Sequence, residues 1–249
     1  MSDSPANGTQ AVIFDLDGTL LDTLEDIAGA MNVVLRARGL PPHPVEAYKQ
    51  VVGQGIDEAV RRACAPPASP AAASPSSSSL PSSSPSSPPS PSPALSDDEV
   101  AGIIRDYRRE YAAAWRLHSR PYPGIPDLLR ALSARGIQAA VLSNKSHPFT
   151  EEMVRELLPG HAFAAVRGAL PDQPLKPDPA AALAIAAGLG VPPASCLFLG
   201  DTNIDMLTAV AAGMVPVGAL WGFRDETELR AHGAAAVIAS PLELLDLLI

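Results

Sequence analysis

Residues 11–20 read Ala11-Val12-Ile13-Phe14-Asp15-Leu16-Asp17-Gly18-Thr19-Leu20, an apolar run that ends in two carboxylates. The run predicts a buried strand over Val12–Leu16. Side chains alternate along a strand, so Asp15 and Asp17 point the same way. Gly18 then allows a sharp turn, and Thr19 offers a hydroxyl and an N–H there. Two carboxylates this close repel unless a cation or a shared proton relieves them. The pattern indicates a divalent-metal site with nucleophilic or acid–base chemistry, although a strand end with an ordinary Asp turn is the alternative.

Further strands and helices alternate along the second half of the chain. Apolar runs predict strands, and periodic segments between them predict helices. The strands are Gln138–Leu142, Cys196–Leu199 and Val215–Leu220; the helices are Asp127–Ala134, Pro148–Leu158, Pro179–Ala187 and Met206–Ala211. This alternation predicts an α/β fold with a Rossmann-like, doubly wound parallel sheet. Ligands bind such sheets beyond the carboxyl ends of the strands, where Asp15, Asp17, Ser143 and Asp201 fall.

The stretch from Leu21 to about Leu117 interrupts this alternation. Apolar residues repeat at helical spacing over residues 24–35 and 103–115, with no strand signal between them. We expect an α-helical subdomain at 23–119, inserted into a core formed by 1–22 and 120–249. Within it, Pro66 to Pro93 is almost pure Ser, Pro and Ala, so we expect a disordered insert at 66–93. A tolerated insertion is favoured there over a phosphorylation or binding segment.

Three more motifs place polar groups at predicted strand ends. Val141-Leu142-Ser143-Asn144-Lys145 offers a hydroxyl and successive N–H groups that could cradle phosphate, although Ser143 could be only a helix N-cap. Leu175-Lys176-Pro177-Asp178-Pro179 contains one of only three lysines, against fifteen arginines. A compact ammonium suits a pocket of phosphoryl oxygens and carboxylates, whereas the alternative is a solvated surface lysine. Two of the three lysines, Lys145 and Lys176, fall in candidate motifs, and the role of Lys145 stays open.

The last motif is Leu199-Gly200-Asp201-Thr202-Asn203-Ile204-Asp205-Met206, in which a buried strand again ends in a glycine and a carboxylate. Asp205 returns to the same region if a helix starts near Asn203. Hard oxygen ligands of this kind favour Mg²⁺. The alternative for Asp205 is a first-turn acid that complements the helix dipole.

Bulk composition excludes several partners. The chain has 249 residues, a net charge of −9 and no basic run, which argues against nucleic acid and anionic membranes as partners. Met1 to Pro5 shows no secretory-signal pattern, and the apolar stretch 179–191 is typical of a packed helix rather than a membrane span. Cys64 and Cys196 are far apart in the sequence and form no disulfide framework, which is typical of a reducing compartment. We therefore expect a cytoplasmic protein. The oligomeric state is left open.

The four motifs, in this order, resemble those of the haloacid dehalogenase-like phosphohydrolases, over the whole chain except the Ser/Pro insert. The resemblance implies a helical cap at 23–119 and a Mg²⁺ ion held by Asp15, the Asp17 carbonyl and Asp201. It implies that Asp15 is the nucleophile and Asp17 the general acid–base, that Ser143, Asn144 and Lys176 bind phosphate, and that Thr19 and Asp205 support the site. Dehalogenases of the family lack the second Asp, so dehalogenation is disfavoured.

Three further segments resemble one branch of this family. Asp22 to Gly39, Val51 to Gly55 and Gly218 to Phe223 look like the phosphoglycolate phosphatases, which implies 2-phosphoglycolate as the small phosphorylated substrate. The loop Gly53-Gln54-Gly55 would then lie over the active site and select the leaving group, although a plain helix–helix turn is the alternative. Sugar-phosphate phosphatases, pyrophosphatases and phosphomutases of the same branch remain alternatives. So does a regulatory binding protein on this fold that uses the Ser/Pro segment.

Overall fold

The computed structural model describes residues 8–65 and 95–248, so the predicted insert at 66–93 lies outside the described residues. Six strands form one parallel sheet in the order β5-β4-β1-β6-β7-β8. They are β1 (Ala11–Phe14), β4 (Gln138–Ser146), β5 (Ala165–Ala169), β6 (Cys196–Gly200), β7 (Val215–Ala219) and β8 (Ala236–Ile238). Because the first strand lies in the middle and later strands add on both sides, the sheet is doubly wound, as predicted.

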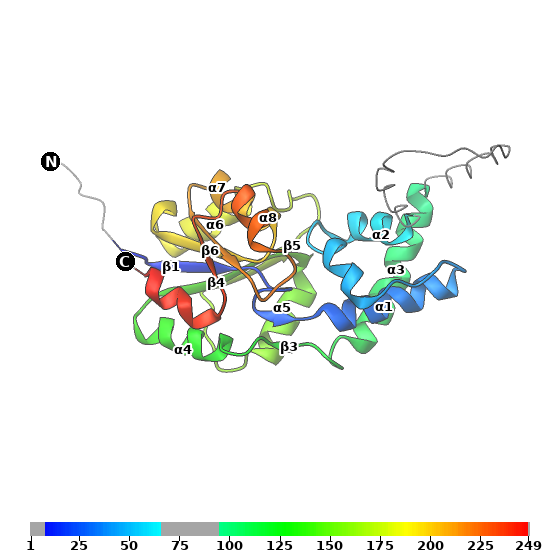
Figure 1. The fold of residues 1–249 in the computed structure, drawn as a ribbon, viewed down its shortest axis with the longest axis horizontal. Coiled ribbons are helices and arrows are strands. Elements are labelled where there is room, and N and C mark those ends of the chain that lie inside the picture. The colour runs from blue at the N-terminus through cyan, green and yellow to red at the C-terminus, as the bar shows by residue number, and fades with distance from the viewer. Residues whose placement is uncertain (1–7, 66–94, 249) are drawn as a thin grey trace, which may run out of the picture.

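Helices cover both faces of the sheet (Figure 1). One face carries α4 (Ile125–Ala134), α5 (His147–Leu157) and the 3₁₀ helix η3 (Pro241–Leu247), and the other carries α6 (Ala180–Leu189), α7 (Asn203–Ala211) and α8 (Glu226–Ala231). The side chains of β1 alternate between the two resulting cores, with Val12 and Phe14 in one and Ile13 in the other. A strand buried on both faces therefore explains the unbroken apolar run of the sequence.

The pairing of β1 with β4 and β6 brings the polar residues of three motifs together at the middle of the sheet. Phe14, the last residue of β1, pairs with Val141 of β4 and Leu199 of β6. The N–H of Asp15 then donates to the carbonyl of Leu199 at 3.0 Å. The motifs that follow β1 and β6, and the motif in the second half of β4, must consequently lie side by side, at the point where the chain switches from one half of the sheet to the other.

A helical subdomain is inserted between two short strands, β2 (Leu21–Asp22) and β3 (Arg120–Pro121), which pair antiparallel. It contains α1 (Leu24–Ala37), the 3₁₀ helix η1 (Val45–Gln50), α2 (Ile56–Cys64) and α3 (Asp97–Ala114), which lie beyond the sheet at one end of the molecule (Figure 1). The long helices α1 and α3 pack together. Helical spacing in the sequence predicted α1 and α3, and the division of the chain into a core and a cap at 23–119 stays a prediction.

Several elements differ from the prediction. β1 ends at Phe14 rather than Leu16, because the chain turns at once and the Leu20 and Leu21 N–H groups donate to the Leu16 carbonyl. β4 continues beyond Leu142 to Ser146 through an irregular register with β5. The short edge strands β5 and β8, the β2–β3 pair and helices α2 and α8 were not predicted. No helix in the described parts of the chain is long and apolar enough to cross a membrane.

Candidate active site

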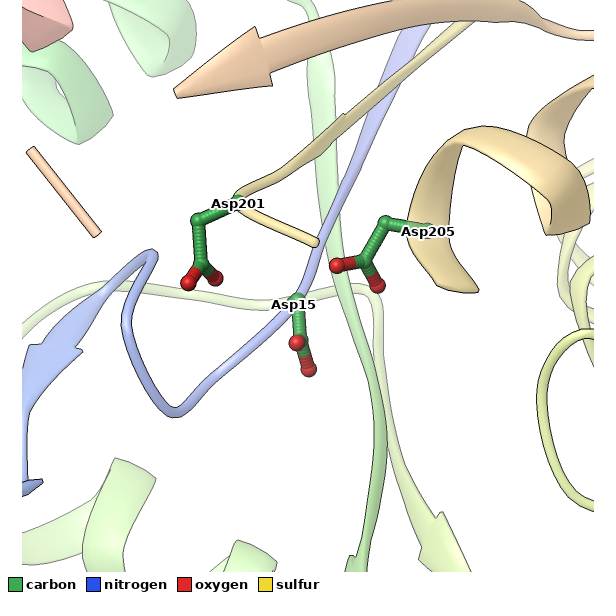
Figure 2. A group of neighbouring side chains, drawn as sticks. All are labelled: Asp15, Asp201 and Asp205. Atoms are coloured by element: carbon green, nitrogen blue, oxygen red, sulfur yellow. The ribbon is translucent and has the colours of Figure 1, made fainter. Parts of the chain in front are cut away.

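Three carboxylates meet at the carboxyl end of the sheet (Figure 2). Asp15 follows β1, Asp201 follows β6, and Asp205 lies in the first turn of α7. All three are buried, and each contributes a carboxylate oxygen to a group whose members lie within 4.8 Å of one another. The structure therefore brings together residues of the first and last motifs, since Asp201 and Asp205 lie 186 and 190 positions after Asp15.

Asp201 is held rigidly by both of its oxygens. The hydroxyl of Thr19 donates to Oδ1 at 2.7 Å, and the N–H of Phe223 donates to Oδ2 at 2.9 Å. Gly18 makes this approach possible: its φ is +86°, and a Cβ there would lie 2.3 Å from Asp201 Oδ2. The turn after β1 thus positions a carboxylate that belongs to β6.

Lys176 links the first and last motifs through two ion pairs. Its Nζ lies 2.8 Å from Asp15 Oδ1 and 2.6 Å from Asp205 Oδ1, and its side chain is buried. The other oxygen of Asp205 accepts hydrogen bonds from the N–H and the hydroxyl of Thr202, at 3.0 and 2.7 Å. Asp205 therefore caps the start of α7 and also contacts the buried lysine, and its supporting role in the site stays a prediction.

The cluster carries more negative charge than its lysine offsets. Burial, followed by the charge of Asp205, raises the pKa of Asp15 to about 7, although Lys176 opposes the shift. Burial and the charges of Asp205 and Asp15 raise the pKa of Asp201 well above its usual range. Burial alone would lower the pKa of Lys176, but Asp15 and Asp205 raise it overall. An all-oxygen, anionic donor set of this kind fits a hard divalent cation.

Asp17 lies outside that cluster and has different partners, although it lines the same cavity as Asp15. Its carboxylate accepts a hydrogen bond from the Thr23 hydroxyl at 2.7 Å, and Lys145 Nζ lies 3.0 and 3.1 Å from its two oxygens. Nζ of Lys145 also lies 4.5 Å from the ring centroid of Tyr111 on α3. Any part of Asp17 in metal binding would consequently fall to its main-chain carbonyl, as predicted by resemblance, and that role stays a prediction.

Ser143 and Asn144 follow the middle of β4 but lie in different surroundings. Ser143 is buried at the cavity and accepts a hydrogen bond from the Lys145 N–H at 3.2 Å. The side-chain amide of Asn144 accepts from the Lys176 N–H at 2.8 Å and donates to the carbonyls of Lys176 and Gly53, at 2.9 and 3.0 Å. Asn144 therefore joins the lysine motif to the helical subdomain, and its predicted phosphate contact stays a prediction.

A cavity of about 870 Å³ lies between the sheet and the helical subdomain. Asp15, Asp17, Ser143 and Lys145 line it from the sheet side, and the opposite wall is largely apolar. That wall includes Val52, Ile56, Tyr107 and Tyr111, and Phe149 of α5 lines the cavity from the core.

Only part of the predicted loop Gly53-Gln54-Gly55 faces the cavity. Gly53 and Gly55 line the cavity. The side chain of Gln54 instead accepts a hydrogen bond from Arg62 of α2 at 2.7 Å. The structure thus places the loop backbone, rather than the glutamine, at the cavity.

Sequence reasoning missed the partners of Asp17. Thr23 lies six positions after it, on the far side of the turn, and nothing in its local pattern singles it out. Tyr107 and Tyr111, which line the cavity, fit the helical spacing of residues 103–115 and were not singled out for the site. The scarcity of lysine did mark Lys145, but only the fold shows its contact with Asp17.

Comparison with known proteins agrees with this geometry. Residues 9–213 match the family model of haloacid dehalogenase-like hydrolases. Phosphoglycolate phosphatase 1 of Pseudomonas aeruginosa is 30% identical over 236 residues, which cover 94% of this chain and 78% of that protein. N-acetylmuramic acid 6-phosphate phosphatase of the same species is 31% identical over 242 residues, covering 96% and 94%. A crystal structure of a "putative phosphoglycolate phosphatase" from Lactobacillus delbrueckii subsp. bulgaricus matches with a TM-score of 0.82 at 30% identity, covering 96% of this chain and 98% of that one. The chain therefore belongs to the haloacid dehalogenase-like hydrolases, as its four motifs predicted.

Proposed function

We propose that this protein is a Mg²⁺-dependent phosphatase that hydrolyses a small phosphomonoester, with 2-phosphoglycolate as the first candidate. One observation carries the proposal: the Asp15 carboxylate is buried at the floor of a cavity, 2.8 Å from the Lys176 ammonium and two residues from Asp17. A carboxylate in such a pocket can act as a nucleophile once a cation offsets its charge. Both Pseudomonas relatives are phosphatases by name.

In the proposed reaction, the Asp15 carboxylate attacks phosphorus and forms an aspartyl-phosphate while the bond to the leaving oxygen breaks. Asp17 gives a proton to that oxygen and then takes one from the water that hydrolyses the intermediate. Lys176 and Ser143 hold the phosphoryl oxygens. Mg²⁺, when held by Asp15, Asp201 and the Asp17 carbonyl, supplies positive charge against the transferring group. Phosphate and an alcohol are the products.

The substrate proposal rests on the relatives and on the size of the cavity. Phosphoglycolate and N-acetylmuramic acid 6-phosphate are both phosphomonoesters that also carry a carboxylate. A cavity of about 870 Å³ has room for either. A sugar-phosphate phosphatase is therefore the second candidate. The N-acetylmuramic acid 6-phosphate phosphatase is matched over 94% of its length, whereas the phosphoglycolate phosphatase is matched over 78%.

The helical region supports a role in substrate selection. We propose that residues 23–119 form a cap over a core of 1–22 and 120–249, and that the 53–55 loop faces the leaving group. The Gly53 carbonyl accepts a hydrogen bond from the side-chain amide of Asn144 on β4 at 3.0 Å, so the loop lies against the sheet. Such a cap would exclude water during the reaction. Cys64 and Cys196 are both free, which supports the cytoplasm as the location.

Phosphate release by the purified protein tests this proposal. We expect hydrolysis of 2-phosphoglycolate or N-acetylmuramic acid 6-phosphate with Mg²⁺, loss of that activity in excess EDTA, and recovery when Mg²⁺ is restored. Ca²⁺ should support activity poorly, because its larger and looser coordination shell misplaces the phosphoryl group. Full activity in EDTA, or no phosphate release from either ester with Mg²⁺, would contradict the proposal.

A further inference from the structure

A second buried lysine lies beside the cavity, apart from the one that contacts the acidic cluster. Lys145 has a side chain only 10% exposed, and Asp17 is its only ion-pair partner among the described residues. Lys176 instead contacts Asp15 and Asp205. Of the two lysines, Lys176 therefore lies beside the proposed nucleophile, and Lys145, which lines the cavity, lies beside the proposed acid.

The position of Lys145 beside Asp17 determines which part of a bound substrate it would contact. An acid that protonates the leaving oxygen must touch that oxygen, so a cation 3.0 Å from Asp17 lies on the leaving-group side. In 2-phosphoglycolate a single methylene separates the ester oxygen from the carboxylate carbon. A substrate whose ester oxygen contacts Asp17 would thus bring its carboxylate within reach of Lys145.

The surroundings of Lys145 strengthen attraction to an anion. Its ammonium carries three donors, and the Tyr111 ring, 4.5 Å away at its centroid, offers a π-face rather than a carboxylate or carbonyl acceptor. Aromatic walls also exclude water, and charges attract more strongly where water is scarce. The other basic residues on the cavity wall are less suited: Arg108 is exposed, and His147 lies 3.6 Å from Glu151.

We propose that Lys145 binds the anionic group of the leaving group, and so selects phosphomonoesters whose leaving group carries a carboxylate close to the ester oxygen. This inference rests on the proposed phosphatase function. The alternative is that Lys145 only positions Asp17, and the two roles differ in one respect. A positioning residue affects every substrate alike, whereas a selective one affects only substrates that carry the anion.

Two esters of the same length test the difference: 2-phosphoglycolate, and 2-hydroxyethyl phosphate, in which a neutral CH₂OH replaces the carboxylate. Lys145→Met removes the charge, and Lys145→Gln removes it but can still hydrogen-bond Asp17. We expect kcat/KM for 2-phosphoglycolate to fall about 10- to 100-fold more than for 2-hydroxyethyl phosphate, the range of a lost charged hydrogen bond. Lys145→Arg should retain part of the preference.

The chain supplies a matched control, because Lys49 is the third lysine and lies outside the cavity lining, paired with Glu46. Lys49→Met should leave the ratio of the two kcat/KM values unchanged. Equal losses for both esters in folded Lys145→Met and Lys145→Gln, or no loss for either, would overturn the inference while leaving the phosphatase function intact. A parent protein that hydrolyses neither ester, nor N-acetylmuramic acid 6-phosphate, would instead overturn the proposed function.

Discussion

Each carboxylate of the Asp15–Asp201–Asp205 cluster has at least one hydrogen-bond donor, yet one side chain supplies all of the positive charge. Asp15 accepts from the Leu16 N–H at 2.7 Å, and Asp201 is held by Thr19 and Phe223. Among the described residues, Lys176 is the only cation that pairs with the cluster. The local charge balance without a metal ion consequently depends on this lysine.

Replacing Lys176 should destabilise the metal-free protein. Lys176→Met leaves Asp15 and Asp205 buried without a cation, and breaking a buried pair in this way costs about 3–5 kcal/mol. Urea unfolding in EDTA measures the loss, and phosphate release should fall with it. Lys49→Met is the control: its exposed pair should change the free energy of unfolding by only about 0.5 kcal/mol or less. Equal stability of Lys176→Met and the parent protein would show that the cluster does not need the lysine.

The residues of this cluster could be predicted because each follows an apolar run or falls at a fixed spacing from one. Asp15 and Asp201 end strands, and Asp205 occupies the first turn of the helix that begins at Asn203. The partners of Asp17 could not be predicted in the same way. Thr23 and Lys145 reach it from separate segments, so their contacts depend on the fold as a whole.

At the scale of elements, burial decided which strands and helices were predictable. The central strands β1 and β6 are buried throughout and appear in the sequence as unbroken apolar runs. The edge strand β5 reads Ala-Val-Arg-Gly-Ala and is only half-buried, so it shows neither an apolar run nor a regular alternation. Helix α2 buries only Val60 and Ala63, so its apolar residues show no clear helical periodicity in the sequence.

The loop between η1 and α2 closely approaches the segment that joins β5 to α6, at Gly55. Its φ is +89°, and a Cβ would lie 2.8 Å from Leu175 Cδ1, next to Lys176. Gly55→Val should therefore disturb both the loop backbone and its contact with the lysine motif. We expect a lower kcat/KM for 2-phosphoglycolate and a smaller loss for an aryl phosphate, because the residues that handle the phosphoryl group belong to the core.

Gly39 offers a matched control for that variant. Its φ is also positive, at +71°, but a Cβ there would meet nothing within 4 Å. Gly39→Val thus introduces similar backbone strain without a contact against the sheet, and the ratio of the two activities should not change. If Gly55→Val lowers both activities equally, general disruption of the helical region is the better explanation. An unchanged ratio and unchanged rates would remove the loop from the site.

At the scale of the whole molecule, hydrogen bonds tie the helical region to the core. Asn144 of β4 donates to the Gly53 carbonyl at 3.0 Å. At the junction, the β2–β3 pair joins the two core segments, and the two ends of the helical region are joined where the buried Asp26 carboxylate of α1 accepts hydrogen bonds from the Ser119 N–H and hydroxyl, at 2.7 and 2.8 Å. Arg224, after β7, donates to the Lys49 carbonyl of η1. The residues that make these contacts lie outside the segment 66–93, which follows α2 and precedes α3 in the sequence.

Deleting Pro67 to Pro93 should therefore have little effect on turnover. A short Gly/Ser linker would bridge the ends, and the change in loop length alters stability by only about 1 kcal/mol or less. The segment is Ser, Pro and Ala apart from Leu80, so it has little apolar surface with which to pack. We expect phosphate release within a few-fold of the parent. Loss of activity in a deletion variant with an unchanged melting temperature would show that the segment contributes to the site.

Asp15 is the proposed nucleophile, and phosphate release by Asp15→Asn tests that role most directly. The amide keeps the size of the side chain but cannot attack phosphorus as an anion. With saturating Mg²⁺ and the best substrate of the parent protein, we expect a loss of about four orders of magnitude or more, alongside an intact circular dichroism spectrum. A purified, folded Asp15→Asn protein that releases phosphate at nearly the parental rate would contradict the account.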